Sequence, residues 1–532
     1  MKIKIINSLL LMGIISLTLS CKDQKESTDT SKMETTNDSI AEAEKFRPSF
    51  HFTPEENWMN DPNGMFYLDG TYHLYFQYYP EDNVWGPMHW GHATSQDMIT
   101  WKEEKIALKP DEKGYIFSGS AVVDKENTSG FGEEGKTPVV AMYTYHDPKG
   151  EKEGRKDYQT QAIAYSTDKG FNWTKFKDNP VIKNEGIKDF RDPKVTRDTI
   201  NDQWLMVLAT VDRTFFYSSQ DLKEWKKISE FGQSTGAHNG VWECPDFFPM
   251  KVEETGETKW VLIQSLNPGG YNGGSGTQYF VGDFDGTTFT PEKNMQNLEE
   301  KHSFWLDFGR DNYAGVTWSN IPTEDGRTLF IGWMSNWLYA QEVPTQKWRS
   351  TMTLARELKL QKLDGVYRIL SEPVKELDAY RTEVHKMSKN EPAKTYTYSA
   401  KTGDLMNKEI SFSLNLKDLE KVDFHLSNSV QDTLKFGLNK TDKQFYVNRK
   451  KSGLTDFSEK FIQKVSTAPR ISNSDTLKVH FILDKTSIEI FYDNGTTVVS
   501  EIFFPNEPYT SFGIRSKSDL HIKDLKVNEI TK

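Results

Sequence analysis

A short internal repeat constrains the fold of this chain most strongly. In each copy a serine is followed two positions later by an aspartate and, four or five residues after that, by a tryptophan. The three clear copies are 95–101, 166–173 and 219–225, and a degenerate fourth copy is 282–289. Successive aspartates are 71, 53 and 64 residues apart, and a strand pattern precedes each copy. Four-stranded units repeated over roughly 300 residues predict a β-propeller of about five blades. Coincidental Ser-Asp turns are the alternative, and the shared position of the tryptophan argues against it.

The propeller is predicted to span 49–365, and two further parts follow it. Residues 366–381 are expected to form a short amphipathic linker helix. From 382 to 532 apolar and polar residues alternate in short segments, which is typical of an antiparallel β-sandwich. The expected strands are 409–416, 421–427, 433–438, 444–448, 476–483, 487–491, 497–503, 510–514 and 522–527. The predicted fold class is therefore all-β, a five-bladed propeller followed by a C-terminal sandwich.

The N-terminal segment indicates export. Residues 1–20 carry two lysines before an apolar run that is too short for an ordinary membrane span, which is the pattern of a signal peptide. Leu19-Ser20-Cys21 is similar to a lipoprotein signal, so Cys21 is the predicted lipidation site; secretion with an unmodified Cys21 is the alternative. Residues 21–48 are mostly polar and are expected to form a tether, lipidated or free.

Composition excludes several classes of function. The formal net charge is −11 and there is no long basic run, which argues against nucleic acid as a partner. Two cysteines make no disulfide framework, and no Cys/His zinc pattern is present. His89 and His92 are three apart on a predicted strand, so they point to opposite faces and do not suggest a metal site. No metal and no cofactor are expected. Aromatic residues make up 13% of the chain, which suits both strands and sugar sites.

The first candidate catalytic acid is Asp61. Asp61-Pro62-Asn63-Gly64 has the composition of a tight turn, and it is followed by an expected hairpin of 65–68 and 71–78 around Asp69-Gly70. A purely structural turn is the alternative. Aromatic and polar residues crowd around this single carboxylate in the sequence, which suits a sugar better than a hydrophobic core.

Two more acids have unusual surroundings. Asp192 lies between Arg191 and a proline that favours extended backbone, and a strand-end turn with a salt bridge is the alternative. Glu243 lies between Trp242 and Cys244, where burial would raise its pKa as a general acid requires. A buried glutamate paired with an arginine is the alternative. In a propeller, acids far apart in sequence can meet in one central pocket, and two carboxylates flanking a bond are the equipment of glycoside hydrolysis.

These motifs resemble glycoside hydrolase family 32, which contains invertases, levanases, inulinases and fructan exohydrolases. The resemblance covers roughly residue 50 to the C-terminus, and no catalytic position departs from the family pattern. The matching runs are Trp58–Gly64 (WMNDPNG), Phe117–Ser120 (FSGS), Arg191–Pro193 (RDP), Trp242–Pro245 (WECP), 311–318 and 344–349.

The resemblance implies specific roles. Asp61 would be the nucleophile, Glu243 the acid/base, and Asp192 the transition-state stabiliser that bonds fructose hydroxyls. The family retains configuration, so the carboxyl groups of Asp61 and Glu243 are expected about 5–5.5 Å apart. Cys244 is expected to be a small packing residue. The implied substrate-binding residues are Trp58, Met59, Asn60, Gln77, Trp85, Phe117, Ser118, Arg191 and Trp318.

The sequence therefore favours an exported β-fructosidase that removes terminal fructose from levan or inulin, with sucrose as a further substrate. The expected partners are a fructan or fructooligosaccharide and, through a lipid anchor alone, a membrane at the periplasmic or cell-surface side. A fructosyltransferase with the same acids and a non-catalytic fructan-binding lipoprotein are the alternatives; the presence of all three acids disfavours the second. The choice between β-2,6 and β-2,1 linkages, between exo and endo action, and of oligomeric state stays open.

Overall fold

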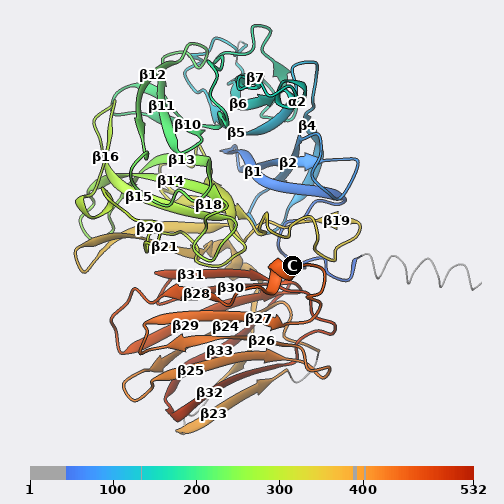
Figure 1. Cartoon of the computed structure of the whole chain (residues 1–532), viewed down its shortest axis with the longest axis vertical. Coiled ribbons are helices and arrows are strands. Elements are labelled where there is room, and N and C mark those ends of the chain that lie inside the picture. The colour runs from blue at the N-terminus through green and yellow to red at the C-terminus, as the bar shows by residue number, and fades with distance from the viewer. Residues whose placement is uncertain (1–43, 134, 388–391, 401–402) are drawn as a thin grey trace, which may run out of the picture. The chain divides into compact units, whose positions relative to one another are not determined.

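The computed structural model describes residues 44–133, 135–387, 392–400 and 403–532 (Figure 1). The predicted signal peptide, Cys21 and residues 21–43 of the predicted tether lie outside this range. The chain divides into units 1–45 and 46–532, and the second is described below. Among the described residues, no helix has the length and apolar character needed to cross a membrane.

Five sheets, antiparallel except for one short parallel pair, follow one another along the first part of this unit, as the repeat predicts (Figure 1). The first contains β1 (Asn57–Leu68), β2 (Thr71–Tyr79), β3 (His89–Ser95) and β4 (Lys102–Leu108), with β19 (Trp348–Arg349) parallel to β1. The second contains β5 (Tyr115–Val123), β6 (Val139–His146), β7 (Gln159–Ser166) and β8 (Thr174–Lys175). The third contains β9 (Arg191–Asp198), β10 (Gln203–Thr210), β11 (Arg213–Ser219) and β12 (Lys226–Phe231). The fourth contains β13 (Val241–Lys251), β14 (Thr258–Asn267), β15 (Gly276–Phe284) and β16 (Phe289–Pro291). The fifth contains β17 (Tyr313–Thr317), β18 (Thr328–Trp333), β20 (Arg356–Leu363) and β21 (Val366–Pro373).

Two six-stranded sheets form the sandwich. One contains β22 (Arg381–Lys386), β33 (Ile522–Ile530), β24 (Lys408–Asn415), β29 (Thr476–Asp484), β30 (Ser487–Tyr492) and β31 (Thr497–Ile502). The other contains β23 (Ala393–Ser399), β32 (Ser511–Leu520), β25 (Lys421–Ser427), β26 (Thr433–Asn439), β27 (Gln444–Lys451) and β28 (Ser466–Pro469). The short helices are α2 (Pro148–Lys152), η1 (Lys293–Met295), η2 (Lys375–Tyr380) and α3 (Glu459–Ile462). Each of the nine strands expected from residue alternation is present, with ends shifted by a few residues.

The sequence repeat is the turn between the third and fourth strands of a blade. Ser95 ends β3, and its hydroxyl accepts backbone N–H groups of the turn, while the Asp97 carboxylate accepts those of Ile99 and Thr100. The Trp101 indole then donates to a carbonyl three residues earlier. The copy at 219–225 repeats all of these bonds. The repeat therefore encodes a capped turn that starts the outermost strand.

All five first strands (β1, β5, β9, β13 and β17) are bulged near their beginnings. The pairing register shifts within 59–62, 116–119, 191–194, 243–246 and 313–316. Three residues inside these shifts have positive φ, namely Asp192 at 66°, Cys244 at 45° and Ala314 at 52°. A bulge bends its strand and redirects a side chain that regular pairing would send elsewhere. The bulges fall at the level of the predicted catalytic acids.

The predicted turn at Asp61–Gly64 is wrong, because these residues lie inside the twelve-residue strand β1. A bulge accommodates Pro62, which cannot donate to a regular ladder. Gly64 has φ of 51°, and a Cβ there would lie 2.6 Å from the buried Trp90 ring. The hairpin itself is confirmed: Leu68 pairs with Thr71 around Asp69-Gly70, both with positive φ as a type I′ turn requires.

The predicted linker helix at 366–381 is also largely wrong. Residues 366–373 are strand β21, which pairs with β20 along its whole length, and only Lys375–Tyr380 forms a 3₁₀-helix. Buried and half-buried residues alternate in Val366–Ile369, which fits a strand, and the pairing with β20 then continues through Pro373.

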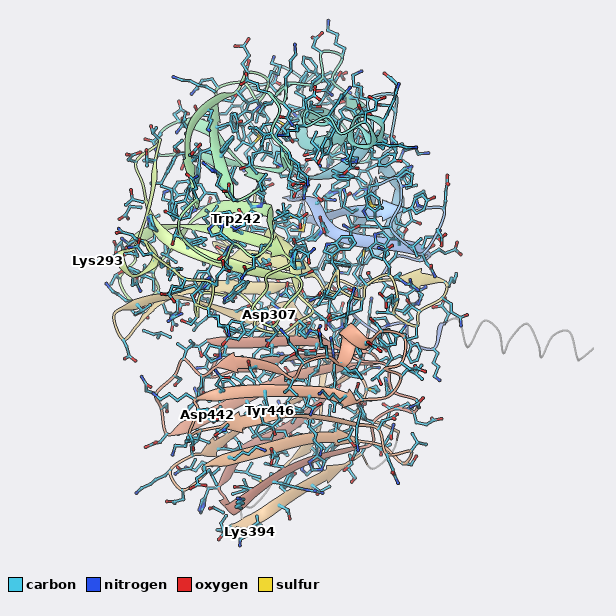
Figure 2. The ribbon with its side chains drawn as sticks, in the orientation of Figure 1. Trp242, Lys293, Asp307, Lys394, Asp442 and Tyr446 are labelled. Carbon is cyan, nitrogen blue, oxygen red and sulfur yellow. The ribbon has the colours of Figure 1, made fainter. Side chains whose placement is uncertain are left out.

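Buried charges connect the propeller to the sandwich. Arg356 of β20 pairs with Asp307 at 2.9 Å and with Glu489 of β30, and Asp307 lies near the junction in Figure 2. His51, which precedes β1, bridges Glu489 and Asp484 at 2.8 Å each. Their side chains are at most 2% exposed. The junction is thus a compensated ionic network set within apolar packing.

Candidate active site

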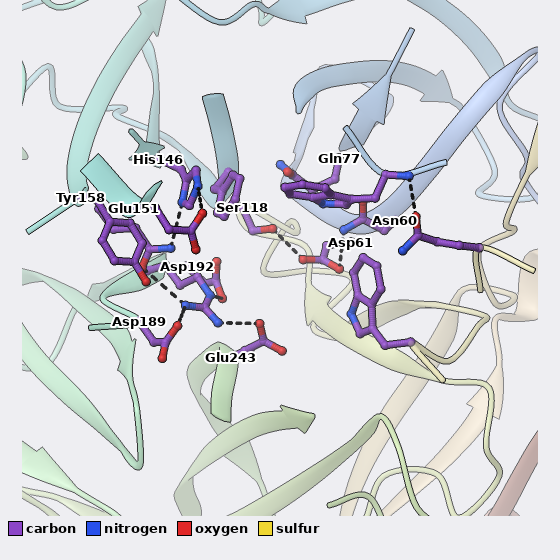
Figure 3. A pocket seen from close by; sticks show the side chains of 16 residues that line it. Asn60, Asp61, Gln77, Ser118, His146, Glu151, Tyr158, Asp189, Asp192 and Glu243 are labelled. Atoms are coloured by element: carbon purple, nitrogen blue, oxygen red, sulfur yellow. Dashed lines mark hydrogen bonds and ion pairs between the residues drawn. The ribbon is translucent and has the colours of Figure 1, made fainter. Parts of the chain in front are cut away.

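Three acids from three blades line one cavity of about 300 Å³ (Figure 3). Asp61 comes from β1, Asp192 from β9 and Glu243 from β13. The first strands of neighbouring blades lie side by side, so the bulges on them bring together residues separated by up to 182 positions in the sequence. The cavity is open at one side and its lining is mainly polar.

Asp61 is held by hydrogen-bond donors on both oxygens. Ser118 Oγ donates to Oδ2 at 2.7 Å, and Asn60 Nδ2 donates to Oδ1 at 3.0 Å. The Cys244 thiol lies 3.5 Å from Oδ2. Burial raises the pKa of Asp61, these donors oppose the rise, and the negative charge of Glu243 adds to it. The donors fix one orientation of the carboxylate in the cavity.

Asp192 is buried and has positive φ. The Cys244 backbone N–H donates to its Oδ2 at 3.0 Å, and its own N–H donates to Thr144 Oγ1 at 3.0 Å. Burial raises the pKa of Asp192 to about 7; Arg191 opposes the rise, while Glu243 and Asp61 add to it. Asp192 is therefore held both through its side chain and through its backbone N–H.

Arg191 is the central cation of the site. Its guanidinium bonds Asp189 at 2.6 Å and Glu243 Oε1 at 2.9 Å. Burial alone would lower the pKa of Arg191, but Glu243, Asp192 and Asp189 raise it well above its ordinary value. The Tyr313 hydroxyl donates to Glu243 Oε2, so both oxygens of this carboxylate have a partner.

The acids outnumber the cation that faces them. Two carboxyl groups, Asp61 and Asp192, have raised pKa values, so the cluster retains a proton in mildly acidic solution. Independently of where that proton resides, two carboxyl groups that face one cavity can act as proton donor and nucleophile at a glycosidic bond.

Most of the predicted substrate-binding residues line the same cavity. They are Asn60, Gln77, Trp85, Phe117, Ser118 and Arg191. Trp85 is 38% exposed at the rim, and its ring meets that of Phe117 edge-on. A flat, exposed ring suits the apolar face of a sugar.

The structure places three predicted residues elsewhere. Trp58 and Met59 are fully buried and do not line the cavity; Trp58 instead supports Asn60, to which its indole donates at 2.8 Å. Trp318 donates to the His73 carbonyl and lines a separate cavity of about 610 Å³ that also includes Lys194. Trp318 directly follows β17, which ends at Thr317 beyond the bulge at 313–316.

Sequence reasoning missed several lining residues. Asp189 precedes the Arg-Asp-Pro motif and so had a signal. Tyr313, which does not line the cavity but bonds Glu243, lies in a run already noted. The rest reach the cavity from loops, from other strands and from the helix α2, without a local pattern. They are His146, Glu151, Tyr158, Gln159, Trp337 and Gln341. Within the described ranges, no group of three or more His, Cys, Asp or Glu residues is arranged to hold a metal ion.

Fold and site together define a glycoside hydrolase. Residues 51–373 match the glycosyl hydrolases family 32 N-terminal domain, and residues 376–529 match the glycosyl hydrolases family 32 C-terminal domain. The chain belongs to glycosyl hydrolases family 32.

Relatives and solved structures agree with this assignment. A levanase of Bacillus subtilis (strain 168) is 44% identical over 496 residues, covering 92% of this chain and 71% of the relative. An extracellular exo-inulinase of Aspergillus niger is 37% identical over 495 residues, covering 87% of this chain and 90% of the relative. The crystal structure of exo-inulinase from Aspergillus awamori superimposes with a TM-score of 0.83 at 34% identity, covering 92% of this chain and 98% of that one.

Proposed function

We propose that this protein is an exported, retaining β-fructosidase. It hydrolyses terminal β-D-fructofuranosyl residues from levan or inulin, and sucrose as well, through a fructosyl-enzyme intermediate. The observation that carries the proposal is the meeting of Asp61, Asp192 and Glu243 in one cavity. The similarity to a levanase and to exo-inulinases supports fructan as the substrate class.

The reaction has two steps. In the first, an Asp61 oxygen attacks the anomeric carbon of the terminal fructose, and the bond to the leaving oxygen breaks as Glu243 gives that oxygen a proton. In the second, Glu243 takes a proton from water, the water oxygen bonds the same carbon, and the ester to Asp61 breaks. A separation of about 5–5.5 Å between the two carboxyl groups leaves no room for an intervening water.

The surrounding residues have supporting roles in this proposal. Ser118 and Asn60 aim the Asp61 carboxylate. Asp192 bonds fructose hydroxyls as positive charge develops on the sugar. Arg191 and Tyr313 hold Glu243, while Trp85 and Phe117 cover the apolar face of the ring.

We also propose how the protein reaches its substrate. Residues 1–20 direct export, Cys21 is lipidated, and the polar segment up to 48 holds the catalytic body away from the membrane. Relatives described as extracellular support export. Contact with the membrane is through the lipid alone, at the periplasmic or cell-surface side, and nucleic acid is not a partner.

The test is fructose release from levan and inulin by the wild type and two isosteric variants. Asp61→Asn and Glu243→Gln each lower the rate at least about 10³-fold, because each removes a group that takes part in bond making or breaking. Asp178→Asn, which alters an exposed acid of the second blade, leaves the rate unchanged. Sizing the products separates exo action, which gives fructose alone, from endo action, which gives a ladder.

A wild type that binds fructan and yields no reducing sugar at any pH would overturn the proposal in favour of a binding protein. Fructosyl transfer to added sugar in place of water would identify a transferase that uses the same acids.

A further inference from the structure

One wall of the cavity belongs to the second blade and has no part in the proposed chemistry. His146 ends β6, Glu151 lies on α2, and Gln159 begins β7. All three line the cavity. Figure 3 shows His146, Glu151 and Tyr158 grouped on one side, with Asn60 and Asp61 on the other.

A chain of hydrogen bonds connects this wall to the catalytic floor. Gln159 Oε1 accepts the Phe190 backbone N–H at 2.9 Å, so the Gln159 amide must turn its NH₂ group toward His146 Nδ1, 3.3 Å away. Nδ1 is then an acceptor, and the ring hydrogen is on Nε2. Nε2–H donates to Glu151 Oε2 at 3.1 Å. Phe190, next to Arg191, thus orients the Gln159 amide. The amide fixes the tautomer of His146, and His146 fixes the position of Glu151 Oε2.

The imidazole of His146 is held rigidly. Its ring stacks on Phe117 with centroids 4.2 Å apart and planes 6° apart, and Tyr158 meets it edge-on at 5.4 Å. Its side chain is 4% exposed, and burial lowers the pKa of His146, which keeps the ring neutral. A neutral ring with both nitrogens satisfied acts here as a fixed donor.

The helix that carries Glu151 is also fixed. Asp147 caps it by accepting the Lys149 N–H at 3.0 Å, and Arg155 bonds the same carboxylate at 3.0 Å. Gly150 is buried in this turn, where a Cβ would lie 2.6 Å from the Arg155 guanidinium. This network fixes the backbone position of Glu151 beside the cavity.

The exposure of the acids shows where along the substrate each one lies. The side chain of Asp192 is 6% exposed, that of Glu243 is 19% exposed and that of Glu151 is 55% exposed. The terminal fructose must reach the buried acids on the floor, so the rest of the substrate leaves through the mouth, where Glu151 lies. Within the described residues, Oε2 has the His146 partner, and Oε1 has no hydrogen bond or ion pair.

We propose that Glu151 is a specificity-determining residue whose Oε1 accepts hydroxyl groups of the sugar on the leaving side of the cleaved bond. His146 is the positioning residue that aims it. The ligand class is a sugar with free hydroxyls, in a fructan or an oligosaccharide. The inference rests on the proposed β-fructosidase activity and adds to it the residue that distinguishes a sugar leaving group from a simpler one.

The test compares two substrates with the same terminal fructose. One is a fructan trisaccharide, and the other is methyl β-D-fructofuranoside, whose leaving group has no further hydroxyl. Glu151→Ala lowers kcat/KM about 10-fold for the trisaccharide and leaves the value for the methyl glycoside unchanged, because a hydrogen bond to a charged acceptor is lost for one substrate alone. His146→Phe keeps the stack on Phe117, removes the donor, and shifts the ratio of the two values in the same direction.

Glu153→Ala is the matched control, since Glu153 directly follows α2, does not line the cavity, and its loss leaves both values unchanged. An equal fall for both substrates in Glu151→Ala would overturn the inference, because it would place Glu151 in the fold or at the terminal fructose. No fall for either substrate would overturn it as well. A wild type that cleaves neither substrate would instead be a failure of the proposed function, and it would be seen before any variant is made.

Discussion

Two clusters of acids in this molecule are built from the same residue types and differ in how far neighbouring cations compensate their charge. At the propeller–sandwich junction, Asp307, Glu489 and Asp484 face the cations Arg356 and His51. At the candidate active site, Arg191 pairs with Asp189, Glu243 and, at 3.9 Å, Asp192, whereas Asp61 has no ion pair within the described residues. Cations compensate most of the negative charge at the junction, whereas much of the negative charge at the site is left uncompensated.

The pKa values follow this difference in charge. At the junction, burial alone would raise the pKa of Glu489, but Arg356 and His51 lower it to about 2. Burial would lower the pKa of His51, and its two acids raise it to about 9. At the site, burial raises the pKa of Asp192 to about 7 despite Arg191. Compensated acids stabilise the fold in their charged form, whereas the site acids cost stability and are retained for chemistry.

Removing a buried cation from the junction is expected to have the largest effect on the free energy of unfolding. Arg356→Met leaves Glu489 and Asp307 buried without this cation, and it lowers the free energy of unfolding by about 3–5 kcal/mol. Chemical denaturation at neutral pH measures the loss. Lys359→Met is the matched control on the same strand: its pair with Glu372 is partly exposed, and its removal costs under about 1 kcal/mol. Equal losses in the two variants would contradict the assignment of the junction as a stabilising network.

A smaller effect is expected from one donor at the site. Ser118→Ala removes the hydroxyl that bonds Asp61, so the pKa of Asp61 rises further and the carboxylate is lost at a higher pH. The acidic limb of the pH–rate profile for fructose release therefore moves toward neutral pH. On the acidic side of the profile the rate falls about 10-fold. Ser120→Ala, two residues along the same strand, removes the bonds to the Pro193 carbonyl and the Val195 N–H but none to Asp61, and it leaves the limb in place. A limb that does not move in Ser118→Ala would contradict the role given to this donor.

Features that depend on local contacts could be predicted from the sequence. The blade repeat was predictable because Ser95, Asp97 and Trp101 all act within one local turn. The catalytic acids carry local motifs, and the sandwich strands carry a period of two. In contrast, Asp61–Gly64 has turn-forming residues but lies in a strand, because pairing with β2 outweighs local preference. Residues 366–373 became a strand for the same reason, by pairing with β20.

The remaining wrong or missing predictions concern the direction of a side chain and contacts between residues that are far apart in the sequence. Trp318 follows a bulge, and a bulge changes which face the later residues take, so its motif did not reveal its location. His146 and Glu151 lie in no motif, and their relation to Arg191 depends on contacts between β6, β7 and β9. The junction network joins residues more than 130 positions apart, such as Arg356 and Glu489. Such contacts have no signature within a local stretch of sequence.

The most direct test of this contrast is the unfolding free energy of the wild type and Asp192→Asn, measured at pH 4 and pH 8. The folded-state pKa of Asp192, about 7, lies above its ordinary value of 3.8, so the folded protein binds more protons and the wild type loses stability as pH rises between these values. Asparagine carries no charge and avoids this loss. We expect Asp192→Asn to be more stable than the wild type by about 2–4 kcal/mol at pH 8, with a much smaller difference at pH 4, and to be nearly inactive at both. A variant that is less stable than the wild type at pH 8 would contradict the claim that the site acids are uncompensated.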